Sequence, residues 1–191
     1  MQEETGRYEG TELHIHICGT IAAALTPWWI HWFRTINPKV RVNASVSTNA
    51  LQFVTFDALT NLVNGRIWID EWHDQPPPPV QWSKGESYGS ECFLVFPASL
   101  DMIMRLSQGR ADSPALMMLQ VTRLPIVIAD AIPQNNEVVD HYLSLLKTRS
   151  NIRFAPRLEG AVTISREKRS SGVNFPGAIQ TCTQLVAESK V

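Results

Sequence analysis

Short apolar runs alternate with longer amphipathic stretches along most of the chain. In the first run, Leu13, Ile15 and Ile17 alternate with His14, His16 and Cys18, which is the period of a β-strand. Five more runs have the composition of strands and lie at residues 40–46, 66–70, 93–96, 124–129 and 152–154. Helices are expected at residues 21–33, from residue 47 onward, and at residues 102–106, 115–121, 137–147 and 177–188. This alternation predicts a central parallel sheet with helices on both faces.

Two of the predicted helices carry a further expectation, about a proline in one and about the inward face of the other. The helix at 21–33 contains Pro27, which either lies one turn into the helix or splits the segment into a short turn and a longer helix. In the helix at 137–147, we expect Val138, Tyr142, Leu145 and Leu146 to face inward.

Both ends of the chain carry a prediction as well. Residues 1–11 are expected to form a flexible or loosely docked tail, so that residues 12–191 make a single domain. Residues 160–175 alternate apolar and polar positions around a charged tip, which predicts a hairpin or flap before the last helix.

The bulk properties exclude several classes of protein. A formal net charge of −1 over 191 residues argues against nucleic-acid binding, which usually requires a basic surface. The longest apolar patch, residues 21–33, is too short to span a bilayer, and the amino terminus lacks a signal-peptide core. The three cysteines are widely spaced and are expected to be buried free thiols. We therefore expect a cytoplasmic protein without a nucleic-acid or membrane partner.

The segment at residues 93–101 points to a ligand site. Its apolar run ends at Pro97, because a proline cannot donate a hydrogen bond within a central strand pair. Ser99 then occupies the N-cap position of the next helix, where its hydroxyl can satisfy a free amide. Ligands of parallel α/β sheets bind at the carboxyl ends of the strands. The segment is therefore either an ordinary capped helix or one wall of a ligand site.

Two other strand ends carry a similar signal. Gly19 and Thr20 join the first strand to a helix, and the free amides of a helix start attract phosphate. A single glycine excludes the Gly-x-Gly-x-x-Gly fingerprint of dinucleotide-binding folds. After the second strand, Ser47, Asn49 and Phe53 open a helical segment, which is either a plain cap with a core phenylalanine or part of a phosphate site. Hydroxyl-rich strand ends at one edge of the sheet favour the phosphate site.

The chain resembles a known family through two motifs. The run Pro97-Ala98-Ser99-Leu100-Asp101-Met102-Ile103, followed by Gly109-Arg110-Ala111-Asp112-Ser113, resembles the Pro-Ala-Ser-Ala-Asn-Thr and Gly-x-Ala-Asp-Asn motifs of the homo-oligomeric flavin-containing cysteine decarboxylases. That family includes phosphopantothenoylcysteine decarboxylase and the peptide cysteine decarboxylases of the epidermin, cypemycin and thioviridamide type. The order of the other segments also matches, over roughly residues 12–185.

The resemblance implies a fold, a cofactor and an assembly. The fold is a flavodoxin-like (Rossmann-like) three-layer α/β sandwich. The cofactor is flavin mononucleotide (FMN), with flavin adenine dinucleotide (FAD) as the alternative, and the assembly is a homotrimer or homododecamer. The residues that the resemblance assigns to the cofactor are Gly19, Thr20, Ile21, Ser47, Asn49, Phe53, Pro97, Ala98, Ser99, Asp101 and Asp112.

The activity that the resemblance implies is the oxidative decarboxylation of a carboxy-terminal cysteine in a ribosomally made precursor peptide. The flavin removes hydride from the carbon that bears sulfur, and the resulting thioaldehyde is an electron sink, so carbon dioxide leaves and an aminoenethiol remains. This chemistry needs no metal. The alternatives are a flavin-binding regulatory or structural subunit without catalysis, and phosphopantothenoylcysteine decarboxylase.

Two departures from the family pattern concern catalysis. Family members usually carry a histidine about fourteen residues before the proline of the Pro-Ala-Ser motif, as a base near the substrate thiol. This chain has Ser83 there, and its nearest histidine is His73. The Pro-x-Met-Asn signature is also absent, which leaves Asn135 or Asp130 to contact the substrate carboxylate. We therefore predict His73, Ser83 and Asn135 as catalytic residues, and the departures argue against phosphopantothenoylcysteine decarboxylase itself.

The segment at residues 160–175 resembles the substrate flap of the peptide enzymes in place and composition. Arg166, Lys168 and Arg169 near its tip would attract a peptide carboxylate, unless the segment is simply an exposed loop.

The remaining aromatic and histidine residues have simpler interpretations. The helix at 21–33 carries Trp28, Trp29 and Trp32, which are expected to cover a subunit contact. For His14, His16 and His31 we favour packing or an interface over catalysis.

Overall fold

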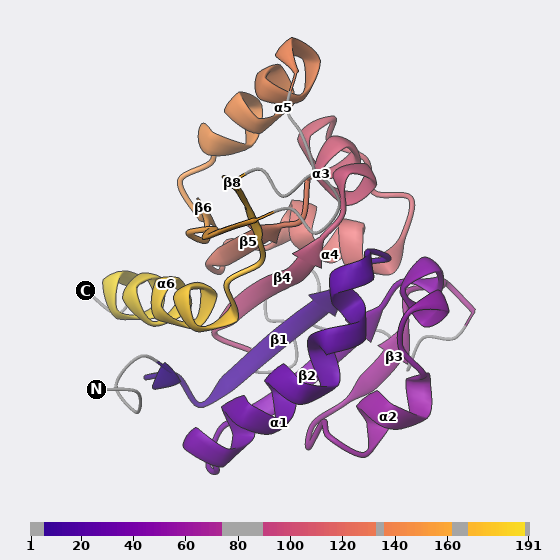
Figure 1. Ribbon diagram of the computed structural model, residues 1–191, viewed down its shortest axis with the longest axis vertical. Helices are drawn as coiled ribbons and strands as arrows, with labels where there is room; N and C mark the ends of the chain where they lie inside the picture. Colours follow the sequence, from indigo (N-terminus) through magenta and orange to yellow (C-terminus); the bar gives the residue numbers. More distant parts are fainter. Residues whose placement is uncertain (1–5, 74–89, 133–135, 162–167, 190–191) are drawn as a thin grey trace.

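A six-stranded, wholly parallel sheet forms the centre of the computed structural model, which describes residues 6–73, 90–132, 136–161 and 168–189. The strand order is β3-β2-β1-β4-β5-β6 (Figure 1). The strands are β1 (Glu12–Ile17), β2 (Arg41–Val46), β3 (Ile67–Ile69), β4 (Cys92–Ala98), β5 (Ile126–Asp130) and β6 (Ile152–Phe154). The order reverses between β1 and β4, and parallel α/β sheets bind ligands beside such a reversal.

Helices cover both faces of the sheet, as the sequence predicted. They are the 3₁₀ helices η2 (Ile21–Leu25) and η3 (Thr48–Gln52), and α1 (Thr26–Ile36), α2 (Phe56–Thr60), α3 (Leu100–Ser107), α4 (Pro114–Val121), α5 (Glu137–Lys147) and α6 (Phe175–Ser189). One buried cluster joins η2, α1, α2 and α6 to the sheet, and a second joins α3, α4 and α5 to its other face (Figure 1). The fold is therefore the expected three-layer sandwich. Among the described residues, no helix combines the length and hydropathy needed to cross a membrane.

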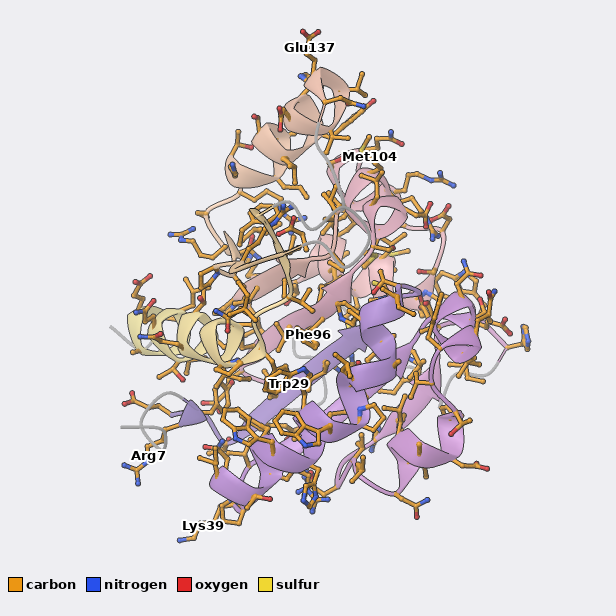
Figure 2. The ribbon with its side chains drawn as sticks, viewed as in Figure 1. Arg7, Trp29, Lys39, Phe96, Met104 and Glu137 are labelled. Atoms are coloured by element: carbon orange, nitrogen blue, oxygen red, sulfur yellow. The ribbon has the colours of Figure 1, made fainter. Side chains whose placement is uncertain are left out.

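An aromatic group fills the layer between β4, α1 and α6. The ring of Phe175 lies 4.8 Å from that of Phe96 and 5.5 Å from that of Trp29, centroid to centroid. Figure 2 shows Trp29 and Phe96 near the centre of the molecule, between α1 and α6. Trp29 and Trp32 are therefore partly buried against the core of the same chain. Trp28 is 58% exposed and is available for the expected subunit contact.

The expected amino-terminal tail is docked where the structure describes it. Tyr8 is only 5% exposed, and its amide donates a hydrogen bond to Asn37 Oδ1 at 2.9 Å. Asn37 Nδ2 in turn donates to the Gly6 carbonyl at 2.8 Å, and Thr183 on α6 donates to the Arg7 carbonyl at 3.0 Å. Residues 6–8 are thus docked against α1 and α6, whereas residues 1–5 lie outside the described part of the chain.

Two predicted helices differ in detail from the observed ones. Pro27 marks the split of the first segment into η2 and α1, which was one of the two alternatives. On α5 the buried residues are Val139, Leu143 and Leu146, while Val138 is 59% exposed and Leu145 is 41% exposed. The prediction is therefore confirmed for Leu146 and wrong for Val138 and Leu145, because the buried face of α5 is rotated by about one residue.

The segment before α6 forms the expected hairpin. Strand β7 (Leu158–Ala161) pairs antiparallel with β8 (Lys168–Gly172), and the pair is separate from the main sheet. The backbone alone is described for residues 159–161 and 168–172, and Arg166 lies outside the described residues.

Candidate functional site

A cavity of about 280 Å³ opens at the carboxyl edge of the sheet. It lies where β1, β2 and β3 end and where α3 and α4 begin. The residues that line it are His16, Cys18, Gly19, Ser47, Thr48, Asn49, Asp70, Ser99, Asp101, Met102, Arg105, Asp112 and Ser113. Its lining is therefore mostly polar, and it comes from five separate segments of the chain.

Short main-chain contacts hold the ends of β1, β2 and β4 together at this cavity. The Cys18 amide donates to the Pro97 carbonyl at 3.2 Å, and the Ser47 amide donates to the Ile17 carbonyl at 2.9 Å. A Cβ atom at Gly19 would lie 2.6 Å from Asn49 Cβ and 2.7 Å from the Asn49 carbonyl carbon. Only glycine therefore allows the β1–η2 turn to approach η3 this closely.

Serine side chains cap three helices at the cavity. Ser47 Oγ accepts from the Ala50 amide of η3 at 3.3 Å, and Ser99 Oγ accepts from the Met102 amide of α3 at 3.2 Å. Ser113 Oγ accepts from the Leu116 amide of α4 at 3.3 Å. The first amides of a helix have no partner within the helix itself, and a helix start carries partial positive charge. The predicted cap at Ser99 is confirmed, and the capping serine also lines the cavity.

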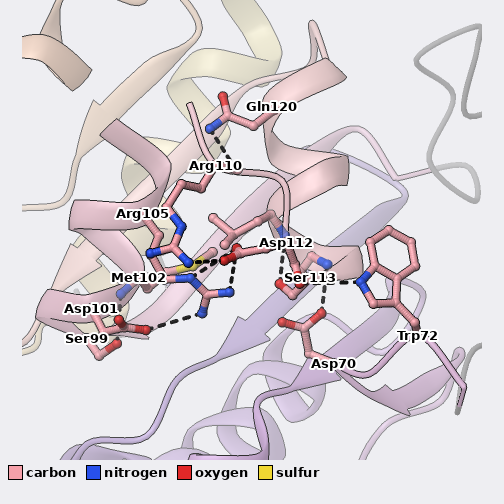
Figure 3. Close-up of polar contacts among 12 residues, drawn as sticks. Asp70, Trp72, Ser99, Asp101, Met102, Arg105, Arg110, Asp112, Ser113 and Gln120 are labelled. Atoms are coloured by element: carbon pink, nitrogen blue, oxygen red, sulfur yellow. Dashed lines mark hydrogen bonds and ion pairs between the residues drawn. The ribbon is translucent and has the colours of Figure 1, made fainter. Parts of the chain in front are cut away.

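An ion-pair network forms the wall opposite the sheet (Figure 3). Arg105 Nη2 donates to Asp112 Oδ1 at 2.6 Å, and Arg105 Nη1 donates to Asp101 Oδ2 at 3.3 Å. Arg110 also pairs with Asp112, so these hydrogen bonds lower the pKa of the Asp112 carboxyl and keep it ionised. Burial opposes the charge of Arg105, but its bonds to the two carboxylates raise its pKa overall.

Asp70, the residue after β3, connects the sheet to α4. Its Oδ1 accepts from the Ala115 amide at 2.7 Å, which satisfies a second free donor at the start of that helix. Nearby, the Trp72 indole donates to the Asp112 carbonyl at 3.3 Å (Figure 3). The cavity thus has three carboxylates, those of Asp70, Asp101 and Asp112, against the single guanidinium of Arg105 in its lining.

Two buried histidines flank Ser45 beneath the cavity. His14 Nε2 lies 2.9 Å from Ser45 Oγ, and His16 Nδ1 lies 2.8 Å from the same oxygen. Burial lowers the pKa of His14 to about 3, with a smaller effect from His16. Burial also lowers the pKa of His16, against the charge of Asp70, which raises it. Both rings are therefore neutral near pH 7.

Six of the eleven residues that were assigned to a cofactor line this cavity: Gly19, Ser47, Asn49, Ser99, Asp101 and Asp112. The other five lie around it. Pro97 and Ala98 are in β4, and their carbonyls accept hydrogen bonds from Cys18 and Ala131. Ile21 is 78% exposed and Phe53 is 38% exposed, so neither reaches the cavity within one chain. Thr20 Oγ1 is buried, and no hydrogen-bond partner for it occurs among the described residues.

Of the three predicted catalytic residues only His73 belongs to the described part of the chain, and it does not line the cavity. The His73 side chain is 83% exposed, and its Nε2 lies 2.9 Å from a Glu71 carboxylate oxygen. Ser83 and Asn135 lie outside the described residues. Asp130, the alternative to Asn135, has a carboxylate that is 6% exposed and forms an ion pair with Arg157. The Asp130 carboxylate is thus already paired with Arg157, which argues against Asp130 as a contact for the substrate carboxylate.

Several lining residues were missed by the sequence analysis, notably His16, Asp70 and Arg105. Strand alternation offered a signal for His16, because His16 and Cys18 share the face of β1 that leads to the predicted Gly19 turn. Asp70 follows a strand directly, as did the residues that were found. For Arg105 the signal was its place one turn after Asp101 on α3.

The chain matches the model of one protein family, described as Flavoprotein, over residues 1–186. It belongs to the Flavoprotein family. A cypemycin cysteine dehydrogenase (decarboxylating) from a Streptomyces species is 50% identical to this flavoprotein over 184 residues, which is 96% of each chain. The crystal structure of the cypemycin decarboxylase CypD has a TM-score of 0.86 at 48% identity and covers 97% of this chain and 98% of its own. The resemblance that the sequence analysis found is thereby confirmed.

The structure of a more distant relative shows the same fold. TvaF, an FMN-dependent cysteine decarboxylase from thioviridamide biosynthesis, has a TM-score of 0.66 at 20% identity and covers 76% of this chain and 89% of its own.

The residues at the cavity fit a flavin that carries a phosphate. Gly19 leaves room for main chain and ligand to approach, and the Thr20 hydroxyl is buried without a partner among the described residues. Ser47, Thr48 and Asn49 offer hydroxyl and amide groups at the start of η3. Such donors bind phosphate without a metal ion.

Proposed function

We propose that this flavoprotein catalyses the oxidative decarboxylation of a carboxy-terminal cysteine in a precursor peptide, with FMN as its cofactor, in the cytoplasm. The observation that carries the proposal is the 50% identity over 96% of both chains to a cypemycin cysteine dehydrogenase (decarboxylating). The polar cavity at the reversal point of the sheet supports it, because that is where a flavodoxin-like fold holds its cofactor.

Two groups of residues are proposed to bind different parts of the cofactor. Gly19 and the segment Ser47–Asn49 would hold the phosphate, since this segment offers hydroxyls and the amides of a helix start and has no carboxylate among its own residues. Ser99 and the pair Asp101 and Asp112 would contact the uncharged part of the cofactor, because a phosphate beside these carboxylates would be repelled. The bound flavin would supply the removal of hydride from the cysteine side chain.

FMN is favoured over FAD by the layout of the site. The donors for one phosphate are grouped at one short turn and at the start of η3, and the carboxylates around Arg105 do not favour a second phosphate. The FMN dependence of the related TvaF is in keeping with this choice.

Proton transfer and substrate binding remain assigned to the residues that the sequence indicated. His73 lies next to Trp72, which contacts the rim at Asp112, so a peptide that covers the rim would meet His73. Ser83 and Asn135 keep their predicted roles near the thiol and the carboxylate. The β7–β8 hairpin supports a flap that closes on the peptide, with Lys168 and Arg169 on β8 as cationic positions.

Exposed apolar side chains near the same edge support self-association. Ile21, Leu25 and Trp28 are 78%, 57% and 58% exposed, and they lie on consecutive turns of η2 and α1. Phe53, at the end of η3, is also exposed. We propose a homotrimer, alone or stacked into a dodecamer, in which this surface faces a second subunit. Light scattering on the purified protein tests the stoichiometry.

The activity is tested with the purified protein and a synthetic peptide that ends in cysteine. Visible absorption of the protein as isolated, or after addition of FMN, reports the cofactor. Mass spectrometry of the peptide should then show the loss of one carbon dioxide and two hydrogens, about 46 Da. The same peptide with a carboxy-terminal amide should remain unchanged, because it has no carboxylate to lose.

The variants His73→Ala and Ser83→Ala then separate binding from proton transfer. Loss of turnover with FMN affinity retained would identify the base. A flavin-loaded protein that leaves varied cysteine peptides unchanged would favour the non-catalytic flavin-binding subunit, and a protein that takes up no flavin would contradict both functions.

A further inference from the structure

Three side chains on neighbouring strands form one hydrogen-bonded chain that ends at the cavity. Ser45 and His16 are paired in register between β2 and β1, and Ser45 Oγ lies 2.8 Å from His16 Nδ1 and 2.9 Å from His14 Nε2. His14 and Ser45 are fully buried and His16 is 2% exposed. His16 also lines the cavity, and no hydrogen bond to its second ring nitrogen, Nε2, occurs within the described part of the chain.

The hydroxyl of Ser45 has one hydrogen, and within the described part of the chain its hydrogen-bond partners are the two histidine rings, so it donates to one ring and accepts from the other. If Ser45 donates to His14, then the neutral His14 ring carries its proton on Nδ1. That atom is buried and lacks a hydrogen-bond partner among the described residues, and the His14 ring packs against the rings of Trp68 and Phe93, 5.0 and 5.2 Å away from centroid to centroid. Unpaired buried N–H groups are rare because they lose the hydrogen bond that water would give.

The opposite arrangement leaves His14 Nδ1 as an unpaired acceptor, which buried sites tolerate better than an unpaired N–H donor. His14 then donates from Nε2 to Ser45, Ser45 donates to His16 Nδ1, and His16 carries its proton on Nε2. Asp70 and Arg105 act on the His16 ring with opposite sign, the carboxylate favouring an N–H and the guanidinium opposing it, so the choice of tautomer rests on His14.

We propose that His16 is a fixed hydrogen-bond donor to the uncharged part of the bound flavin, with Ser45 and His14 as positioning residues that hold its tautomer and orientation. The inference rests on the proposed flavin cofactor and adds a contact to it. His16 is assigned to the uncharged part for reasons of charge. The Asp70 carboxylate acts on the His16 ring and would repel a phosphate there, whereas the hydroxyls proposed to hold the phosphate belong to a separate segment, Ser47 and Thr48 at the start of η3.

The test compares two ligands that differ only in the phosphate, FMN and riboflavin. Flavin is removed from the protein, and each ligand is titrated back while the quenching of flavin fluorescence is followed. For His16→Leu we expect the affinity for both ligands to fall by the same factor, roughly ten- to hundredfold, because a buried donor is lost. For His16→Gln, whose amide nitrogen can occupy the place of Nε2, we expect affinities within about threefold of the wild type.

Two further variants complete the comparison. Ser45→Ala removes the group that orients His16, and we expect a smaller, equal loss for FMN and riboflavin. Thr48→Ala at the phosphate end should weaken FMN and leave riboflavin unchanged, which makes it the matched control. Circular dichroism of each flavin-free variant confirms that the fold is retained, and Ser45→Ala and His16→Gln keep the test informative if His16→Leu does not fold.

The possible outcomes are separable. A His16→Leu variant that loses affinity for FMN alone would place His16 at the phosphate and overturn the inference. Unchanged affinities for both flavins in His16→Leu and Ser45→Ala would also overturn the inference. The proposed function would still stand in that case, provided that the wild-type protein binds flavin. A wild-type protein that binds neither flavin would contradict the proposed function, and the inference with it.

Discussion

Gly19 and Asn49 are in contact through the main chain, although thirty residues separate them in the sequence. A Cβ atom at Gly19 would lie within 2.6 Å of Asn49 Cβ and 2.7 Å of its carbonyl carbon. The β1–η2 turn and the start of η3, the two segments proposed to hold the phosphate, are therefore packed directly against each other. Their separation is set by the absence of a side chain at position 19.

We expect Gly19→Ala to push these two segments apart. The added methyl group meets main-chain atoms that cannot rotate away, so the cost of overpacking should be about 1–3 kcal/mol in the free energy of unfolding. The affinity for FMN should fall by at least about tenfold, because both sides of the phosphate site move. Chemical denaturation and flavin titration measure the two effects.

Gly109 provides the matched control for this substitution. Its φ is +73°, and no atom lies within 4 Å of a Cβ built there. Gly109→Ala should therefore cost about 1 kcal/mol of stability through backbone strain and leave FMN affinity unchanged. Equal FMN affinities for Gly19→Ala and the wild type would show that the turn does not form the phosphate site.

The cap at Ser99 is predicted to serve both stability and ligand binding. Ser99→Ala leaves the Met102 amide without its acceptor and removes a hydroxyl from the cavity. Asn136→Ala removes the equivalent cap of α5, where Asn136 Oδ1 accepts from the Val139 amide at 3.0 Å away from the cavity. Each substitution should cost about 1 kcal/mol in the free energy of unfolding.

Only Ser99→Ala should also weaken FMN binding, which titration of the flavin-free proteins measures. If both variants bind FMN as the wild type does, Ser99 acts as a helix cap and nothing more.

The fold and much of the site could be predicted from the sequence because they depend on local signals. Apolar runs of strand length, separated by helical periods, fix a parallel sheet. The carboxyl ends of parallel strands meet at one edge of the sheet. Gly19 and the hydroxyl-bearing residues Ser47 and Ser99 were therefore predicted to lie close together, and all three line the cavity. No knowledge of the packing was needed for that step.

The parts that escaped prediction depend on contacts between distant segments. On α5, residues 138, 142 and 145 have the same spacing as residues 139, 143 and 146, so the pattern alone does not choose the buried face. His14 and His16 were expected to pack or to lie at an interface. Their joint contact with Ser45 depends on the register of β1 against β2, which no local signal in β1 reveals. The docked segment at residues 6–8 likewise depends on Asn37 and Thr183.

Tyr8 tests the docking of that amino-terminal segment. It is 5% exposed, and its ring lies 6.1 Å from that of Phe33 in the core beneath α1. Tyr8→Ala should lower the free energy of unfolding by about 3–5 kcal/mol, as for other large aromatic side chains removed from a core. The exposed neighbour Glu9 is the control, and Glu9→Ala should stay within about 0.5 kcal/mol of the wild type. Urea unfolding followed by tryptophan fluorescence measures both, and a Tyr8→Ala variant as stable as Glu9→Ala would mean that the segment is not docked in solution.

The burial of His14 predicts how stability depends on pH. The pKa of His14 is lowered from 6.5 to about 3 by burial, so between these values the unfolded chain binds a proton that the folded protein does not. Stability therefore falls as the pH falls below 6.5, and His14 alone should account for a loss of about 2 kcal/mol between pH 7 and pH 5. His16 acts in the same direction.

In His14→Gln the decrease in stability between pH 7 and pH 5 should be smaller than in the wild type by about the same 2 kcal/mol. His141→Gln, which removes an exposed histidine of α5, is the matched control. Denaturant unfolding of the three proteins at pH 7 and pH 5 makes the comparison, and parallel pH dependences in all three would show that His14 is able to take up a proton in the folded state.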